Sequence, residues 1–227
     1  MNNNRVLEPR LFKYVNLLMK RYPKLAPIKE NLINAYLMME ASYERDCKLL
    51  IAGNGGSAAD SEHIAGELMK RFKTPRPVTE DFAEKLIAVD SKVGSELAQK
   101  LERGLVAIPL VEREALSTAY INDVDGYGVF AQQLFGYGRP GDVFLGISTS
   151  GNSKNIINAT VVAKASDIRV IGLTGADGGR LAEVADVAVR VPETESYMIQ
   201  ELHLPIYHCW CLMLEDHFFG NADKEKD

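Results

Sequence analysis

The sequence predicts an α/β fold: a single doubly wound parallel sheet flanked by helices, with a helical pair at the N-terminus. The first observation is that short apolar runs alternate with stretches of helical periodicity, which is typical of strands joined by helical crossovers. The second is the segment Leu49–Phe72, where an apolar run passes through Gly53-Asn-Gly-Gly56 into a helix that starts near Ser57. With 227 residues the chain can bury one sizeable core, so we expect a single domain over residues 1–227.

Two amphipathic helices are predicted within residues 1–46, before the first strand. Apolar residues form one helical stripe in residues 8–21, and a second helix starts near Pro27 and runs towards Glu44. These helices either cover the sheet or pack against a second subunit. We favour the second option and expect a homo-oligomer, because helices that precede every strand have little of their own to pack on.

Residues 75–104 are predicted to form a helical insertion. Large apolar residues recur at threes and fours from Phe82 to Leu101, which indicates a helical segment broken near Gly94. A short strand at an edge of the sheet follows, because Pro109 cannot donate to a central ladder. The remaining predicted elements are strands (105–110, 142–147, 168–174, 187–191), helices (112–119, 130–136, 153–166, 180–184, 196–219), a polar loop (120–128) and a disordered charged tail (221–227).

Composition and charge argue against several classes of partner. The net charge of −5 disfavours nucleic acid, which demands a basic face. The three cysteines form no disulfide pattern, so the default compartment is the reducing cytoplasm. No apolar run approaches the ~20 residues that span a bilayer, and we expect no membrane association. Small phosphorylated substrates fit this composition, because helix dipoles and hydroxyls hold phosphate without a basic surface.

Two polar loops follow predicted strands and open helices. The glycines of the Gly53–Ser57 loop permit positive φ and close approach of a ligand, and the next helix offers free N–H groups to an anion. The Ser148-Thr-Ser-Gly-Asn-Ser153 loop adds four hydroxyls and one glycine, which suit phosphate oxygens. The alternative is a polar turn in which Asn152 or Ser153 caps the helix. Both loops end strands of one parallel sheet, which favours a shared phosphate site.

The glycine loop does not predict a nucleotide cofactor. Its glycines lack the full G-x-G-x-x-G spacing, because Ala58 stands at the third position. No acidic residue follows a second strand at the expected distance, so we expect no nucleotide cofactor.

Four side chains on two helices are candidates for catalysis or metal binding. His63 and Glu67 lie four residues apart on one helix face, and Gln200 and His208 lie within about 80° of a common face of the final helix. The set is either acid/base machinery or a ligand set for a divalent ion such as zinc, which binds imidazole and carboxylate. The alternative for His63 and Glu67 is a solvated pair on an exposed helix face.

The other histidines and two of the cysteines have simpler explanations. His203 lies off the shared face and either packs or faces solvent, whereas His217 is expected to be solvent-exposed near the end of its helix. Cys209 and Cys211 lie about 200° apart on a helix, so we expect core packing rather than a shared metal ion.

These motifs resemble a known family. Ordinary sugar isomerase (SIS) domains share the serine loop 148–153, but they do not combine it with the His63/Glu67 pair and the Gln200/His208 pair together. The resemblance covers nearly the whole chain except residues 75–104. The chain resembles the bacterial phosphoheptose isomerases, which have a flavodoxin-like SIS fold. Three segments carry the resemblance: Ala52-Gly-Asn-Gly-Gly-Ser57 with His63 and Glu67, Leu145-Gly-Ile-Ser-Thr-Ser-Gly-Asn-Ser153, and Ile199-Gln-Glu-Leu-His203 with His208.

The resemblance implies interconversion of sedoheptulose 7-phosphate and D-glycero-D-manno-heptose 7-phosphate, for activated-heptose biosynthesis. It also implies a homotetramer with sites at subunit interfaces. Glu67 and His208 match the family's catalytic pair, and His63, Glu67, Gln200 and His208 match the zinc ligands of some members. The implied substrate-binding residues are Asn54, Gly55, Gly56, Ser57, Glu67, Asn122, Asp123, Ser148, Thr149, Ser150, Ser153 and Gln200.

The chemistry suits these residues. Isomerisation through a cis-enediol needs a carboxylate or imidazole base at the carbon acid and a partner for the oxygen protons. We assign Glu67 as the base and His208 as the partner, with the reverse assignment open, and expect a metal or Gln200 to support the oxyanion. The insertion at 75–104 and Tyr197, which replaces a common acidic residue, leave the exact phosphosugar open. The alternatives are an isomerase of another phosphosugar and a non-catalytic SIS protein that binds a sugar phosphate or a protein.

Overall fold

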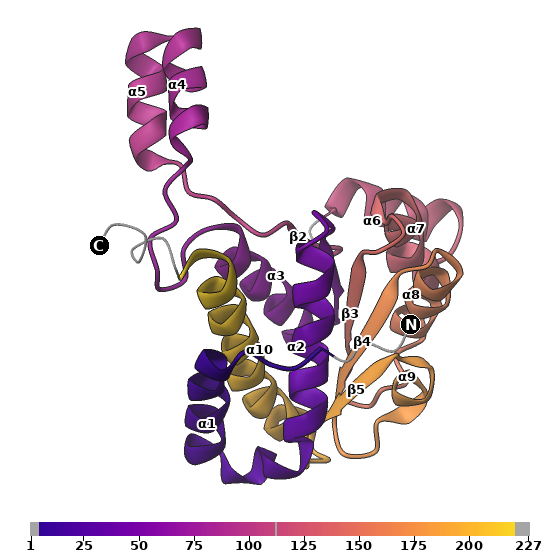
Figure 1. Ribbon diagram of the computed structural model, residues 1–227. Coiled ribbons are helices and arrows are strands. Elements are labelled where there is room, and N and C mark those ends of the chain that lie inside the picture. The colour runs from indigo at the N-terminus through magenta and orange to yellow at the C-terminus, as the bar shows by residue number, and fades with distance from the viewer. Residues whose placement is uncertain (1–4, 112, 221–227) are drawn as a thin grey trace.

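The computed structural model describes residues 5–111 and 113–220 and is built around one parallel sheet (Figure 1). Its five strands lie in the order β2-β1-β3-β4-β5. This is the doubly wound order of flavodoxin-like sheets, so the predicted fold class is confirmed. The strands are β1 (Leu49–Ala52), β2 (Ala107–Pro109), β3 (Val143–Ile147), β4 (Arg169–Thr174) and β5 (Val187–Arg190).

Strand β1 is the switch point of the sheet. It pairs with β2 on one side and with β3 on the other, and Ile51 is level with both Pro109 and Leu145. Successive crossovers therefore leave β1 in opposite directions, which opens a crevice beyond the carboxyl ends of the strands. The loops after β1 and β3 are neighbours at this crevice. Strand β2 lies at the edge, as the proline predicts.

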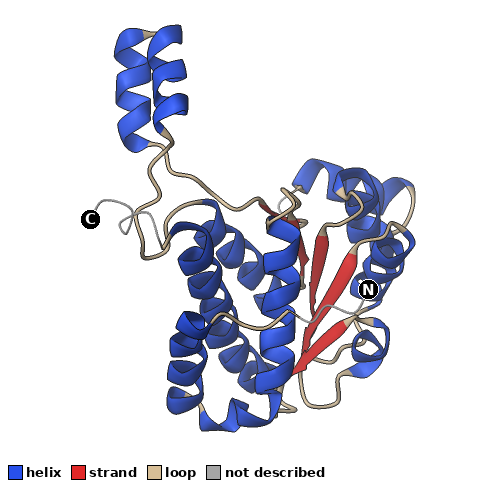
Figure 2. Cartoon of the chain, viewed as in Figure 1, coloured by secondary structure: helices blue, strands red, loops and turns tan. Residues whose placement is uncertain are grey.

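Helices cover both faces of the sheet (Figure 2). Alternate side chains of a strand point to opposite faces. Ile51 and Leu145 join a core with the helices on one face, and Leu50 and Phe144 join a second core on the other. The first face carries α3 (Gly56–Met69) and α10 (Ser196–Phe219), and the second carries α7 (Val129–Tyr137), α8 (Lys154–Ala165) and α9 (Gly179–Val184).

The N-terminal helices bury their apolar stripes within this chain. Leu11, Val15 and Leu32 are fully buried, and the indole of Trp210 on α10 donates to the carbonyl of Leu32 (3.0 Å). The expectation that these helices have little of their own to pack on is therefore wrong, because α10 lies beside them and takes up their apolar side chains. The segment comprises η1 (Pro9–Leu11), α1 (Phe12–Arg21), η2 (Pro23–Ile28) and α2 (Lys29–Tyr43).

The predicted insertion forms a helical hairpin that projects from the body of the molecule (Figure 1). It consists of α4 (Glu80–Val89) and α5 (Ser91–Lys100). The break lies at Asp90 rather than near Gly94, because the Asp90 carboxylate caps the first turn of α5. Gly94 instead lets the two helices touch, since a Cβ there would meet the carbonyl oxygen of Leu86 at 2.1 Å.

One predicted loop is largely helical. Helix α6 (Glu114–Asp123) runs into the region expected to be a polar loop, and a short 3-10 turn, η3 (Gly126–Gly128), follows it. Asn122 and Asp123 consequently sit in the last turn of a helix. The tail predicted to be disordered, 221–227, lies outside the described residues.

Candidate active site

The glycine loop after β1 exposes the amino end of α3. Gly55 has φ +56° and precedes the helix, and no side chain caps the first turn. Gly53 approaches its neighbour closely, since a Cβ there would lie 2.4 Å from the carbonyl oxygen of Ser57. Asn54, Gly55 and Gly56 are exposed, whereas Ser57 is buried. The first three of these predicted contacts are thus open to a ligand, although the N–H groups of Ser57 and Ala58 are already bonded to the carbonyls of Asn54 and Gly55.

The serine loop after β3 is held by its own hydroxyls. Ser148 Oγ and Ser153 Oγ lie 2.9 Å apart, and Thr149 Oγ1 lies 3.4 Å from Ser196 Oγ at the start of α10. Ser153 precedes α8 but makes no side-chain cap, and the side-chain Oδ1 of Asn152 accepts from the backbone N–H of Arg180 in α9. The alternative in which Asn152 or Ser153 caps α8 is therefore wrong. The N–H of Ile156 donates to Asn155 Oδ1 (3.0 Å), which leaves the N–H groups of Lys154 and Asn155 for an anion.

A reciprocal amide pair joins the two loops. Asn54 donates to Asn155 Oδ1 (3.0 Å), and Asn155 donates to Asn54 Oδ1 (2.8 Å). Gln200 approaches from α10, since a Cβ on Gly56 would meet its amide nitrogen at 2.8 Å. The two loops are thus in contact with each other, and each is in contact with α10.

His63, Glu67 and His208 come together at the interface of α3 and α10. His63 Nε2 lies 3.3 Å from Glu67 Oε1 and 3.4 Å from His208 Nε2. His63 is exposed, and the side chain of Glu67 keeps 16% of its exposure. Burial lowers the pKa of His208 below its usual range, the nearby His63 acts in the same direction, and Glu67 opposes them. His208 is thereby held neutral near pH 7, the form that can accept a proton.

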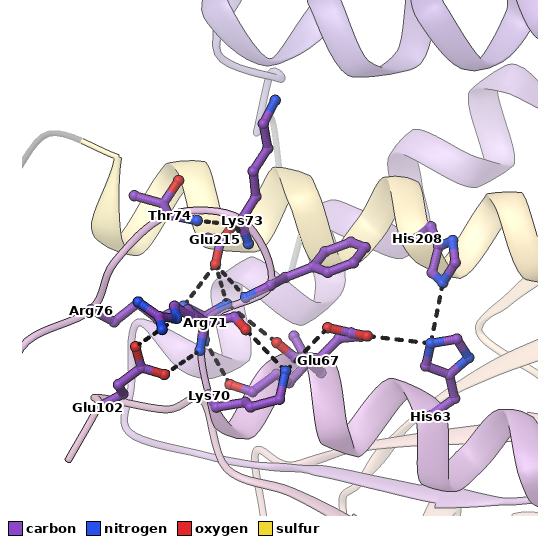
Figure 3. A network of polar contacts seen from close by, with 12 residues as sticks. His63, Glu67, Lys70, Arg71, Lys73, Thr74, Arg76, Glu102, His208 and Glu215 are labelled. Carbon is purple, nitrogen blue, oxygen red and sulfur yellow. Dashed lines mark hydrogen bonds and ion pairs between the residues drawn. The ribbon is translucent and has the colours of Figure 1, made fainter. Parts of the chain in front are cut away.

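A buried ion pair fastens this end of α3 to α10 (Figure 3). Arg76 is fully buried and donates to Glu215 Oε1 (3.0 Å), to the carbonyl of Leu68 (2.8 Å) and to that of Glu67 (3.3 Å). The Glu215 carboxylate also accepts from the backbone N–H groups of residues 72–74. Arg76 thus satisfies the last carbonyls of α3, next to the candidate base.

Several residues of this region were not predicted. Asn155 was missed because an asparagine in a first helical turn is read as part of a cap. Tyr207, whose hydroxyl lies 3.0 Å from Asp60 Oδ1 and 3.1 Å from His63 Nδ1, was missed because a tyrosine in an apolar helix reads as core. A signal did exist, since Asp60 and His63 share a helix face at i,i+3. Arg76 sits in a proline-rich connector that has no periodicity to place it.

Other predicted residues lie elsewhere. Asn122 donates to Asp123 (2.8 Å), both are exposed on α6, and in the described chain neither hydrogen-bonds another predicted site residue. His203 is buried, and its Nε2 lies 3.3 Å from the Thr174 carbonyl. The expectation that His217 is solvent-exposed is wrong, because its side chain is 16% exposed and its Nδ1 lies 2.8 Å from Glu8 Oε1.

Cys209 and Cys211 are both buried in the core, as predicted, and neither forms a disulfide. Burial raises the pKa of the Cys209 thiol to about 12. A thiol with such a pKa is a poor nucleophile and metal ligand at neutral pH. Both cysteines are therefore structural.

Three of the four donors proposed for zinc, His63, Glu67 and His208, fit in chemistry and partly in spacing, whereas the Gln200 amide lies against Gly56. Tetrahedral zinc with bonds of about 2.1 Å places its ligand atoms about 3.4 Å apart, close to the separations around His63 Nε2. The atoms of His63, Glu67 and His208 do not all lie within 4.8 Å of one another, so the set is open on the Glu67–His208 side. Within the described residues, a tighter group that could hold a metal is Glu40, Glu44 and His217.

Known proteins with similar sequences identify the family. Phosphoheptose isomerase 2 of Campylobacter jejuni is 40% identical over 197 residues, which are 85% of this chain and 85% of that protein. The phosphoheptose isomerase of Sulfurimonas denitrificans is 40% identical over 197 residues, 85% of this chain and 88% of that one. The chain belongs to the phosphoheptose isomerase family. The predicted resemblance is confirmed.

Solved phosphoheptose isomerases share this fold. The enzyme of Neisseria gonorrhoeae superposes with a TM-score of 0.69 at 31% identity, over 91% of this chain and 97% of that one. The enzyme of Francisella tularensis gives a TM-score of 0.71 at 27% identity over the same shares. A model of the SIS domain matches residues 96–175, which include the serine loop. Within the described residues, no helix combines the length and apolar character needed to cross a membrane.

Proposed function

We propose that this phosphoheptose isomerase family member interconverts sedoheptulose 7-phosphate and D-glycero-D-manno-heptose 7-phosphate, for activated-heptose biosynthesis. The observation that supports the proposal is that the two anion-suited loops contact each other, and that the serine loop contacts α10, the helix that brings His208 to His63 and Glu67. The serine loop, with Ser148, Thr149, Ser150 and Ser153 before the uncapped α8, is the proposed phosphate clamp. The glycine loop and Gln200 are assigned to the hydroxyl-bearing chain of the sugar, as are Asn122 and Asp123, which would have to approach from α6.

The proposed reaction moves one proton between adjacent carbons. Glu67 removes a proton from C1 of the ketose, the C1–C2 bond becomes the double bond of a cis-enediol, and the same proton or a solvent proton is returned at C2. His208, neutral because its pKa is lowered, transfers the proton between the two oxygens. The alternative assigns the reverse roles to Glu67 and His208.

A divalent ion would be held by His63, Glu67, Gln200 and His208. When bound, zinc would polarise the substrate carbonyl and stabilise the oxyanion of the enediol. In its absence the amide N–H of Gln200 supplies a donor for that oxygen.

The assembly proposed for the enzyme rests on the family resemblance, and the proposed location on the chemistry of the cysteines. We propose a homotetramer in the cytoplasm, acting without nucleic acid or nucleotide cofactor. The described cysteines are free thiols, which supports a reducing compartment. The net charge of −5 supports a small anionic substrate bound by local dipoles rather than a polyanion.

A panel of phosphoketoses, assayed with and without a chelator, tests the proposal. Sedoheptulose 7-phosphate should be turned over with the highest kcat/KM of the panel. Glu67→Gln should lose turnover by about a thousandfold or more at unchanged unfolding temperature. A preference for a shorter or amino sugar would move the assignment to another phosphosugar. Absence of turnover on every ketose phosphate, with or without added zinc, would contradict an isomerase and favour a binding role.

A further inference from the structure

The side chain of Tyr207 reaches the candidate site but has no part in the mechanism above. Its ring is buried in the core with 1% of its surface exposed, and its hydroxyl emerges between α10 and α3. The hydroxyl oxygen lies 3.0 Å from Asp60 Oδ1 and 3.1 Å from His63 Nδ1. Asp60 and His63 project from neighbouring turns of α3. A buried tyrosine always needs a partner for its hydroxyl, but Asp60 alone would satisfy that need.

The donors and acceptors of Asp60, Tyr207 and His63 determine which atom donates in each of the two hydrogen bonds. A phenol has one proton to donate, and an ionised carboxylate only accepts. The Tyr207 proton therefore points to Asp60, and the phenol oxygen accepts from Nδ1–H of His63. A neutral imidazole carries one proton, so its Nε2 is left with a free lone pair. Nε2 is the atom that faces Glu67 Oε1 and His208 Nε2.

We propose that Asp60 and Tyr207 form a positioning relay that holds His63 as the Nδ1–H tautomer and directs its Nε2 lone pair into the active site. The relay makes His63 an acceptor. Glu67 and His63 then place two acceptor atoms 3.3 Å apart, a contact that is favourable when a proton or a cation lies between them. The hydroxyl proton of a bound enediol meets this requirement, as does a divalent ion.

The relay has a role in the proposed isomerisation, and this part rests on the proposed function. Moving a carbonyl from C2 to C1 requires the proton of one hydroxyl to leave as the other oxygen gains one. An imidazole fixed as an acceptor binds the hydroxyl that must lose its proton. An imidazole free to exchange tautomers would present a donor there for part of the time. Tyr207 is accordingly a positioning residue that acts through His63.

The tautomer can be read without any enzyme assay. Long-range ¹H–¹⁵N correlation spectra of protein labelled at its four histidines, recorded at pH 8, distinguish Nδ1–H from Nε2–H, and His63→Asn assigns the signal. We expect Nδ1–H for His63 in the unaltered protein, and loss of that preference in Tyr207→Phe and in Asp60→Asn. The matched control is Tyr43→Phe, which deletes the hydroxyl of another buried tyrosine, bonded to the Val106 carbonyl at 3.2 Å. The control should leave the His63 signal unchanged.

Two outcomes overturn the relay. An Nε2–H tautomer of His63 in the unaltered protein reverses the proposed direction of the hydrogen bonds. An unchanged His63 spectrum in Tyr207→Phe shows that the phenol does not set the tautomer.

Kinetics give the second readout. Tyr207→Phe should lower kcat on sedoheptulose 7-phosphate by about tenfold with KM changed less than threefold, whereas Tyr43→Phe should match the unaltered enzyme. In a His63→Asn background, Tyr207→Phe should have no further effect, because the relay acts through that imidazole. If the unaltered protein does not turn over the substrate, the proposed function fails while the spectra still decide the relay. If it does and Tyr207→Phe is equally active, the relay has no catalytic role.

Discussion

Asn54 and Asn155 exchange two hydrogen bonds across the switch point of the sheet, from Nδ2 of each to Oδ1 of the other at 3.0 and 2.8 Å. Asn54 belongs to the glycine loop after β1, and Asn155 to the first turn of α8 behind the serine loop. The pair therefore fixes the distance between the loop assigned to the sugar chain and the loop assigned to the phosphate. It spans two segments that lie 101 residues apart in the sequence.

Breaking this pair should impair catalysis more than stability. Asn155→Ala removes the two hydrogen bonds with Asn54 and the one that Asn155 Oδ1 accepts from the Ile156 N–H, each worth about 1 kcal/mol. We expect kcat/KM on the phosphosugar to fall by about 10- to 30-fold. Asn54→Ala also removes a proposed substrate contact and should lose at least as much, and the double variant should be no worse than Asn54→Ala, because both changes break the same pair. Additive losses would show that the two side chains act separately, and steady-state kinetics of the three variants distinguishes these results.

The Arg76–Glu215 pair should be essential for stability. Glu215→Gln leaves a buried guanidinium without its counter-charge, which costs about 3–5 kcal/mol. The control is Glu44→Gln, which breaks an exposed pair with Arg5 that is worth less than about 1 kcal/mol. Urea unfolding of both variants measures the difference. Equal, small losses would mean that water or another group replaces the carboxylate.

The sequence predicts the parallel sheet better than it predicts the residues of the candidate site. The alternation of apolar runs and helices predicts the parallel sheet. Pro109 predicts the edge strand, because proline cannot donate a hydrogen bond to a neighbouring strand. The roles of Arg76 and Asn155 could not be predicted, because their partners Glu215 and Asn54 are distant in sequence, and Arg76 also lies in a connector without periodicity. The break of the hairpin was misplaced at Gly94, since a glycine between close helices resembles a glycine that ends one.

The N-terminal helices show the same limit. Their apolar stripes predict a buried face, but only the tertiary structure shows that α10 covers it. His217 was misjudged for a related reason. The end of a helix is commonly exposed, but here the segment around Glu8 folds back over it.

Acid should destabilise the protein through His203. Burial, opposed by its hydrogen bond to the Thr174 carbonyl, lowers the pKa of this imidazole from 6.5 to about 4. The unfolded chain therefore binds a proton that the folded chain refuses, and stability present above pH 6.5 is lost as pH falls towards 4. Between pH 7.5 and 4.5 this group alone accounts for about 2.5 kcal/mol.

Comparison with His203→Leu isolates this contribution. The variant should lose about 2.5 kcal/mol less than the unaltered protein over the same pH interval, as measured by urea unfolding at both pH values. Parallel losses in the two proteins would show that His203 accepts its proton in the folded state without penalty.

The hairpin of α4 and α5 should be dispensable for folding of the isolated chain. Phe82 and Val89 on the hairpin are exposed, and among the described residues of α4 and α5 only Gly94 is buried. The two ends of the hairpin are close, because Pro77 and Glu102 form a bridge at its base. Replacement of residues 80–100 by a short Gly-Ser linker should change the free energy of unfolding by less than about 1 kcal/mol. A loss of several kcal/mol would show that the hairpin packs against another copy of the chain.

The most direct test of the proposed isomerisation is proton exchange in D₂O, followed by NMR of the product formed from sedoheptulose 7-phosphate. A base that removes the C1 proton and exchanges it with solvent before returning a proton at C2 leaves deuterium at C2 of the aldose. The side chain of Glu67 retains contact with solvent, so such exchange is expected. We predict deuterium at C2 with the unaltered protein and no labelled product with Glu67→Gln. An aldose without deuterium would show that the base returns the proton it removed, whereas the same labelled product from Glu67→Gln would contradict the assignment of Glu67 as the base of a cis-enediol isomerase.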